Sequence, residues 1–282
     1  MENQENQENQ ENPFDAKETR FWSIKTIPKF IFRGIPRLIL ILIMYIIVFI
    51  ITIFFTKKNQ KLINKTLKWT GRIKLYFFGY NHIDISQSHL KYIQESKSQI
   101  IIAKHSSYID LLLMSYLFPD AKFIASEYIS RIPIIRRFGK SKCIYLKNDF
   151  GGNLTEDIQK ELDNGNKIVF FSEGVCSNPR FLLKLRNGAF VPKQNILPIH
   201  IDYGDNYWVM GEQDMILHAF TQMSNTRNHV KVRVIPDYHV TEDDKQDIEI
   251  FKDNFRKYYA NGFNVKLSDK SYKEHPYFKL KL

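Results

Sequence analysis

The chain has 282 residues, of which 44% are hydrophobic and 14% aromatic, which is ample apolar material for one large domain or two small ones. The formal net charge of +11 favours an anionic partner, but the sequence has no zinc-ligand spacing and no RNA-binding sheet signature, which argues against nucleic acid. Its two cysteines, Cys143 and Cys176, exclude a disulfide framework and a cysteine metal site, and they fit a reducing compartment.

The chain begins with an acidic stretch of low complexity. The triplet Glu-Asn-Gln repeats from Glu2, and no apolar side chain follows Met1 within the repeats. Because nothing there compensates for the entropy of ordering the backbone, we predict a disordered tail over residues 1–18. The composition is that of neither a secretory signal peptide nor a basic mitochondrial presequence.

A basic segment follows. Residues 19–83 carry twelve Lys and Arg and no acidic residue, a distribution that favours an anionic surface. Aromatic and basic residues interleave from Phe21 to Arg37, where Gly34 and Pro36 interrupt the pattern. This pattern is typical of a segment at a membrane interface, and an ordinary surface helix is the alternative.

The longest apolar run of the chain extends from Leu38 to Phe55, eighteen residues without a charge. As a helix it would be about 27 Å long, close to the hydrocarbon thickness of a bilayer. We predict a transmembrane or membrane-embedded helix over residues 38–55; a hairpin within one leaflet and a buried soluble helix are the alternatives. The next stretch, Gln60 to Tyr80, has the pattern of a basic amphipathic helix lying on the membrane, so residues 19–80 form the predicted anchoring segment.

From about His82 the pattern is that of an α/β domain, which we place at residues 81–265. Short β-branched runs alternate with helical stretches, which predicts a largely parallel sheet flanked by helices. A longer helix with an acidic start is expected over Thr241–Ala260, and a C-terminal tail over residues 266–282. The predicted strands are Gln99–Ala103, Lys122–Ala125, Cys143–Leu146, Lys167–Phe171, Ile196–Ile201 and Val230–Ile235, with a helix over Asn153–Asn164 among them.

A histidine and an aspartate follow the first of these strands. His105 lies between the strand and the next helical run, and Asp110 lies five residues further on. In open α/β sheets chemistry is placed at that edge. If Asp110 reaches back from the first helical turn, its carboxylate holds one ring N–H of His105 and leaves the other nitrogen to act as a general base. The alternative is a histidine that caps the helix beside an ordinary first-turn aspartate.

A second polar group follows the predicted strand Lys167–Phe171. Glu173 and Gly174 form a turn that we expect at the same sheet edge as His105, since glycine permits a sharp bend or a close approach to a ligand. Lys184 and Arg186 come shortly after, and basic side chains there suit a phosphate group. A plain turn with a solvated basic helix is the alternative.

The ordered motifs resemble the glycerolipid acyltransferase superfamily, which includes the 1-acylglycerol-3-phosphate and lysophospholipid acyltransferases. His105 and Asp110 resemble its first block, Phe171-Ser172-Glu173-Gly174 its glutamate-glycine block, and Leu197-Pro198 its later proline block. The resemblance is closest to the lysophosphatidylcholine and lysophosphatidylethanolamine branch, through Cys176-Ser177-Asn178 and Gly188-Ala189-Phe190. The chain departs from the pattern at Ser172, at Val175 and at Lys147, which stands near the usual arginine of the second block.

The resemblance implies an acyl-CoA-dependent transfer of a fatty acyl group to the free hydroxyl of a lysophospholipid or lysophosphatidate. His105 would be the general base and Asp110 its orienting group; Glu173, Gly174, Lys147, Lys184 and Arg186 are the expected substrate-binding residues, with Glu173 either orienting the acceptor or organising the turn. Acyl-CoA is then a co-substrate, and no bound cofactor or metal is expected. The endoplasmic reticulum membrane is the expected location, with a mitochondrial membrane as the alternative. The alternative function is an acyltransferase-like structural subunit of a membrane protein complex that binds lipid with little turnover.

Overall fold

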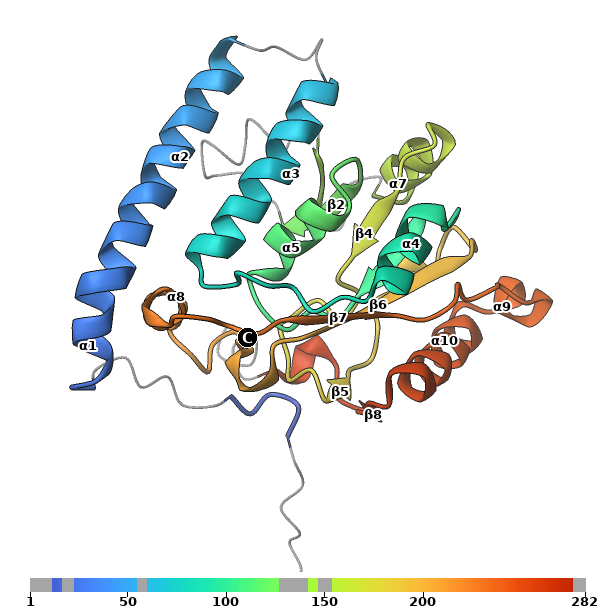
Figure 1. Cartoon of the computed structure of the whole chain (residues 1–282). Helices are drawn as coiled ribbons and strands as arrows, with labels where there is room; N and C mark the ends of the chain where they lie inside the picture. The colour runs from blue at the N-terminus through green and yellow to red at the C-terminus, as the bar shows by residue number, and fades with distance from the viewer. Residues whose placement is uncertain (1–11, 17–22, 55–59, 127–141, 147–153, 276–282) are drawn as a thin grey trace, which may run out of the picture.

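The computed structural model describes residues 12–16, 23–54, 60–126, 142–146 and 154–275 (Figure 1). A six-stranded sheet with the order β3-β2-β4-β1-β6-β7 forms the centre of the molecule. Neighbouring strands are parallel except for the edge strand β7, which is antiparallel to β6. The strands are β1 (Ile100–Ala103), β2 (Lys122–Ser126), β3 (Cys143–Leu146), β4 (Ile168–Phe170), β6 (Ile196–Asp202) and β7 (Lys231–Val234). All six predicted strands are therefore confirmed.

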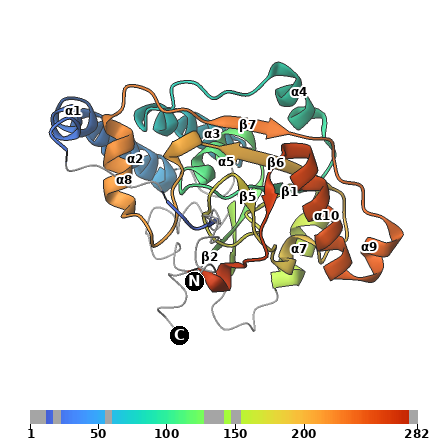
Figure 2. The same ribbon diagram turned by 90° about the horizontal axis from the view of Figure 1, so that it is seen from below.

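Helices cover both faces of this sheet, which gives three layers (Figure 2). On β1, Ile101 and Ala103 face α3, α4 and α5, whereas Ile100 and Ile102 face α7 and α10. This alternation follows from the two-residue period of a strand, and it explains why the β-branched runs are apolar at every position. The helices are α3 (Gln60–Phe77), α4 (Gln87–Glu95), α5 (Asp110–Leu117), α7 (Leu154–Asp163), α8 (Met215–Ser224), α9 (Glu242–Gln246) and α10 (Ile248–Phe263).

The apolar segment forms a helix that starts earlier than the sequence pattern predicts. α1 (Thr26–Lys29), a π-helical turn (Phe30–Gly34) and α2 (Ile35–Phe54) follow one another without a break. Neither Gly34 nor Pro36 ends the helix: Gly34 is the last residue of the π turn, where the Ile35 N–H donates to the Phe30 carbonyl oxygen, and Pro36 follows in the first turn of α2. Such a turn accommodates the missing N–H and the ring of a proline.

By length and composition this helix could cross a membrane. Ile41, Met44 and Val48 form a buried stripe, whereas most other apolar side chains of α2 up to Ile50 are exposed. The base of the helix is attached to α8, because Arg37 donates to the carbonyl oxygens of Met223 and Asn225 at 2.7 and 2.6 Å. One stripe of α2 thus faces protein, and the rest is apolar surface.

The basic helix α3 packs between α2 and α5 (Figure 1). We expected its apolar face to lie on the membrane, but Leu75 on that face is fully buried in the core of the domain. Gly71 permits a close approach, since a Cβ atom there would lie 3.3 Å from the Leu112 carbonyl oxygen of α5. Trp69 remains exposed on the outer side of the helix.

The expected helix over Thr241–Ala260 is in fact two helices. Asp247 ends α9 with an extended backbone and caps α10, accepting from the N–H groups of Glu249 and Ile250. A second N-cap inside an acidic, amphipathic stretch is difficult to distinguish in a sequence from ordinary surface acids.

Segments near both ends of the described chain pack against the segment that follows β4. Residues 12–16 lie within the expected disordered tail, yet Phe14 is 2% exposed and packs with Val175, Leu183 and Val209. The Asn178 N–H donates to the Pro13 carbonyl oxygen at 2.9 Å. At the other end, within the expected C-terminal tail, β8 (Lys266–Leu267) pairs in parallel with β5 (Phe181–Leu182). Parts of both expected tails therefore contact the domain through packing and pairing with residues far away in the sequence.

Replacing Phe14 with Ala should lower the free energy of unfolding by about 3 kcal/mol, as for other buried Phe side chains. The measurement is urea-induced unfolding of the purified, detergent-solubilised protein. The matched control is Phe32→Ala, because Phe32 is 80% exposed and its truncation removes little packing. Equal effects of the two substitutions would contradict the docking of residues 12–16.

Candidate active site

The sheet topology gathers the polar groups at the carboxyl edge of three adjacent strands. β1 lies between β4 and β6 and is parallel to both. The segments that follow these strands carry His105, Glu173 and Tyr203 respectively. Because parallel strands end at the same edge, residues far apart in the sequence meet there. The prediction that Glu173 and His105 share one edge is confirmed.

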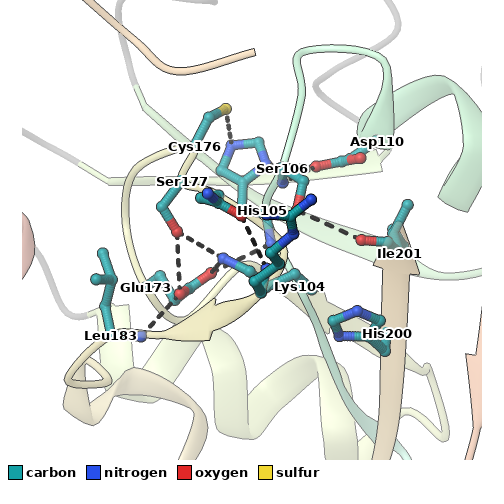
Figure 3. Close-up of polar contacts among 12 residues, drawn as sticks. Lys104, His105, Ser106, Asp110, Glu173, Cys176, Ser177, Leu183, His200 and Ile201 are labelled. Atoms are coloured by element: carbon teal, nitrogen blue, oxygen red, sulfur yellow. Dashed lines mark hydrogen bonds and ion pairs between the residues drawn. The ribbon is translucent and has the colours of Figure 1, made fainter. Parts of the chain in front are cut away.

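His105 and Asp110 form the expected pair (Figure 3). The Nδ1 atom of His105 lies 2.8 Å from Oδ2 of Asp110. Asp110 is the first residue of α5, so its side chain reaches back over the loop that carries His105. The imidazole is 21% exposed and the carboxylate is fully buried. This geometry orients the ring and directs its second nitrogen, Nε2, away from the carboxylate.

Asp110 is itself held by three further donors. The backbone N–H groups of Ser106 and Ser107 donate to Oδ2 at 2.7 and 2.9 Å, and the Tyr203 hydroxyl donates to Oδ1 at 2.7 Å. Hydrogen bonds to the ionised form stabilise a buried carboxylate and fix its orientation. Asp110 therefore serves as a rigid anionic support for His105.

The His105 ring also contacts two residues from the turn after β4. Phe171 stacks against it with ring centroids 4.4 Å apart, and the Sγ atom of Cys176 lies 3.3 Å from Nε2. Burial lowers the pKa of His105, but the Cys176 sulfur and the Asp110 carboxylate outweigh it and raise the pKa from 6.5 to about 10. The environment thus stabilises a proton on this ring, so the neutral form that can act as a base becomes more populated as the pH rises toward this pKa.

Glu173 points into the protein. Its carboxylate accepts from Lys104 Nζ at 2.6 Å and from the Leu183 N–H at 2.9 Å, and both side chains of the ion pair are nearly inaccessible. Lys104 also donates to the Ser177 hydroxyl at 2.5 Å. Of the two roles expected of Glu173, these contacts support the second, because they hold the turn after β4 against the His105 loop (Figure 3).

Gly174 and Arg186 lie together beside that turn. Gly174 has φ +79°, and a Cβ atom there would lie 2.8 Å from Cδ of Arg186, so both backbone conformation and space favour glycine. The Gly174 N–H donates to the Phe171 carbonyl oxygen, so it is engaged within the turn. Arg186 is exposed, with its guanidinium 4.8 Å from the centre of the Tyr272 ring. Lys184 is also exposed, and Lys147 lies outside the described residues.

Three residues of the polar cluster around His105 were not predicted from the sequence to have a role in it. Lys104 directly precedes His105, Cys176 lies in the glutamate-glycine block, and Tyr203 follows β6. The position of Tyr203 just after a strand was the available signal for its place at the edge. Within the described parts of the chain, no group of three or more His, Cys, Asp or Glu side chains is arranged to hold a metal ion.

Comparison with known proteins identifies relatives. The lysophosphatidylcholine acyltransferase of Drosophila melanogaster is 24% identical over 215 residues, which are 72% of this chain and 40% of that protein. The lysophospholipid acyltransferase LPEAT1 of Arabidopsis thaliana is 27% identical over 183 residues, which are 60% of this chain and 46% of that protein. The chain thus spans less than half the length of these relatives.

A solved structure shares the fold. The crystal structure of the 1-acyl-sn-glycerophosphate acyltransferase PlsC from Thermotoga maritima aligns with a TM-score of 0.58 at 18% identity, covering 84% of this chain and 100% of that one. Residues 84–202 match the family model described as Acyltransferase, a range that includes His105, Asp110 and Glu173. The matched region is thus similar in sequence to an acyltransferase family model and to lysophospholipid acyltransferases, and the fold is that of the PlsC structure.

Proposed function

We propose that the protein transfers a fatty acyl group from acyl-CoA to the free hydroxyl of a lysophospholipid. The observation that carries this proposal is the contact of His105 with Asp110, at 2.8 Å on the carboxyl edge of the sheet. A supported imidazole whose second nitrogen lies at a partly exposed rim can deprotonate an alcohol. The names of the relatives supply the substrate class.

In the proposed reaction Nε2 of His105 takes the proton of the acceptor hydroxyl while its oxygen attacks the thioester carbonyl. The tetrahedral intermediate then collapses, the carbon–sulfur bond breaks, and the CoA thiolate leaves with the proton returned by the imidazolium. Asp110 keeps the ring in one tautomer and stabilises its positive charge. The products are a diacyl phospholipid and free CoA, so no covalent enzyme intermediate is needed.

Arg186 is the best-supported candidate for contact with a substrate phosphate. It is exposed, and it contacts the turn whose residues hold His105. A guanidinium presents paired donors that match phosphate oxygens. Lys184 and Lys147 remain additional candidates that act as simple positive charges.

A membrane location fits both the substrate and the surface. The exposed apolar side chains of α2 and the acid-free, basic region of residues 19–83 favour an anionic bilayer. The acceptor lipid is concentrated there. We propose the endoplasmic reticulum membrane, with a mitochondrial membrane as the second choice. The two free cysteines suit a domain that faces a reducing compartment.

The test is an assay with labelled acyl-CoA and four acceptors: lysophosphatidylcholine, lysophosphatidylethanolamine, lysophosphatidate and monoacylglycerol, which lacks the phosphate. We expect transfer to at least one phosphate-bearing acceptor. Arg186→Gln should lower kcat/KM for that acceptor about tenfold, the value of one charge-assisted hydrogen bond, and leave transfer to monoacylglycerol unchanged.

Arg186→Lys and Lys91→Gln are the controls for this assay. The lysine variant keeps the charge without the paired donors, so its loss should be smaller than that of the glutamine variant. Lys91 is exposed on α4, and its replacement should have no effect. No transfer to any acceptor, together with stoichiometric purification in a membrane complex, would instead support the structural-subunit function.

A further inference from the structure

The Cys176 thiol contacts the nitrogen of His105 that faces away from Asp110. Its Sγ atom lies 3.3 Å from Nε2, and Cys176 is 2% exposed (Figure 3). The turn that carries Cys176 is tied to the His105 loop, because the Ser177 N–H donates to the His105 carbonyl oxygen at 2.9 Å. Ser177 is in turn held by Lys104. The position of the sulfur is therefore set by the same contacts that shape the site.

A thiol can form a hydrogen bond with the imidazole ring in either of its protonation states. A neutral imidazole has one N–H and one lone pair; Asp110 accepts the N–H at Nδ1, which leaves the lone pair on Nε2. The thiol can donate to that lone pair, and after protonation the sulfur can accept from the Nε2–H. A sulfur hydrogen bond is weak, so an incoming alcohol displaces it at small cost.

We propose that Cys176 is a positioning residue for the acyl transfer proposed above. Between turnovers its thiol is hydrogen-bonded to Nε2 of His105 and keeps that nitrogen at the rim. When the acceptor binds, its hydroxyl replaces the thiol as the hydrogen-bond partner of Nε2. This role rests on the proposed function. Asp110 at Nδ1, Phe171 against the ring face and Cys176 at Nε2 then fix the ring on three sides.

The charges around the ring determine the sign of the expected pH effect. Burial raises the pKa of the Cys176 thiol, which keeps it uncharged at neutral pH. A hydrogen bond from the protonated Nε2–H to the sulfur is charge-assisted and therefore stronger than one from the thiol to the neutral ring, so the contact raises the pKa of His105 and removal of the sulfur should lower it. The rate follows neutral imidazole and rises with pH through this pKa. The ionisable groups facing His105 are Asp110 of α5, Cys176, and the buried pair Lys104 and Glu173, with Tyr203 and Tyr108 behind them.

The experiment compares Cys176→Ala and Cys176→Ser with Cys143→Ala, which removes the other cysteine of the chain. Cys176→Ala should reduce kcat about tenfold, keep KM for the lysophospholipid within about twofold, and move the rising limb of kcat/KM to lower pH. Cys176→Ser keeps a donor and an acceptor and should stay within about threefold of the unmodified kcat. Cys143→Ala should change neither quantity.

A second measurement does not require turnover. In protein with nitrogen-15-labelled histidines, the titration of the His105 nitrogens should show a lower pKa in Cys176→Ala than in the unmodified chain, with His105→Gln used for assignment. An unchanged pKa and pH profile in Cys176→Ala overturns the inference whether or not the chain is an acyltransferase. A labelled acyl group that stays on Cys176 after denaturation overturns it too, because the thiol would then be a nucleophile. If no acyl transfer is found but the His105 pKa is lower in Cys176→Ala, the result contradicts the proposed function and not the contact between Cys176 and His105.

Discussion

His105→Ala is expected to lower the proposed acyl transfer by a factor of about 10² to 10⁴, because it removes the proposed general base for the acceptor hydroxyl. The fold should survive, since the imidazole is partly exposed and its carboxylate partner keeps three other donors. The measurement is turnover of labelled acyl-CoA by purified protein in lipid vesicles, with the thermal unfolding midpoint recorded beside it.

The matched control for this substitution is His89→Ala. His89 lies half-buried in the first turn of α4, outside the hydrogen-bonded cluster of His105 and Asp110. Its transfer rate should equal that of the unmodified chain. Retained turnover in His105→Ala with an intact fold would remove His105 from the chemistry and, with it, the proposed mechanism.

Glu173→Gln is expected to act on stability, with a loss of about 3 kcal/mol in the free energy of unfolding. The substitution leaves the Lys104 ammonium buried without its counter-charge, and breaking a buried pair in this way is costly. Urea-induced unfolding measures the loss. Glu242→Gln is the control, because the Glu242–Lys245 pair lies on the surface with Glu242 82% exposed and should contribute less than about 1 kcal/mol.

A double variant separates structure from substrate binding. Lys104→Met combined with Glu173→Gln removes both charges and should recover much of the stability lost in the single variant. Suppose that Glu173→Gln instead keeps full stability and only raises KM for the lysophospholipid. Glu173 would then contact the substrate, and the turn would not depend on the buried ion pair with Lys104.

Much of the central sheet could be predicted from the sequence because its strands are short β-branched runs. The run at β1 is apolar at every position since both of its faces are covered. The antiparallel direction of β7 could not be predicted, because the segment between β6 and β7 contains a helix, α8, as a parallel crossover also would.

The contact between His105 and Asp110 could be predicted because the two residues lie five positions apart, on one loop and the helix that follows it. For Glu173, the choice between orienting the acceptor and organising the turn could not be made from the sequence. A glutamate at the end of a strand has the same pattern whether it faces a ligand or a buried lysine, and only the packing of Lys104 beneath it decides. Cys176 and Tyr203 reach the site through turns whose course depends on contacts far away in the sequence.

Because residues 12–16 and the pairing of β8 with β5 support the turn that holds His105, the unit that folds is larger than the range matched by the family. A chimera that exchanges only residues 84–202 with a relative would leave Val175 and Leu183 without Phe14, Val209 and Tyr272. The turn beside His105 would then lack the side chains that pack against it on one side. Exchanges between related chains should therefore carry both flanking segments together.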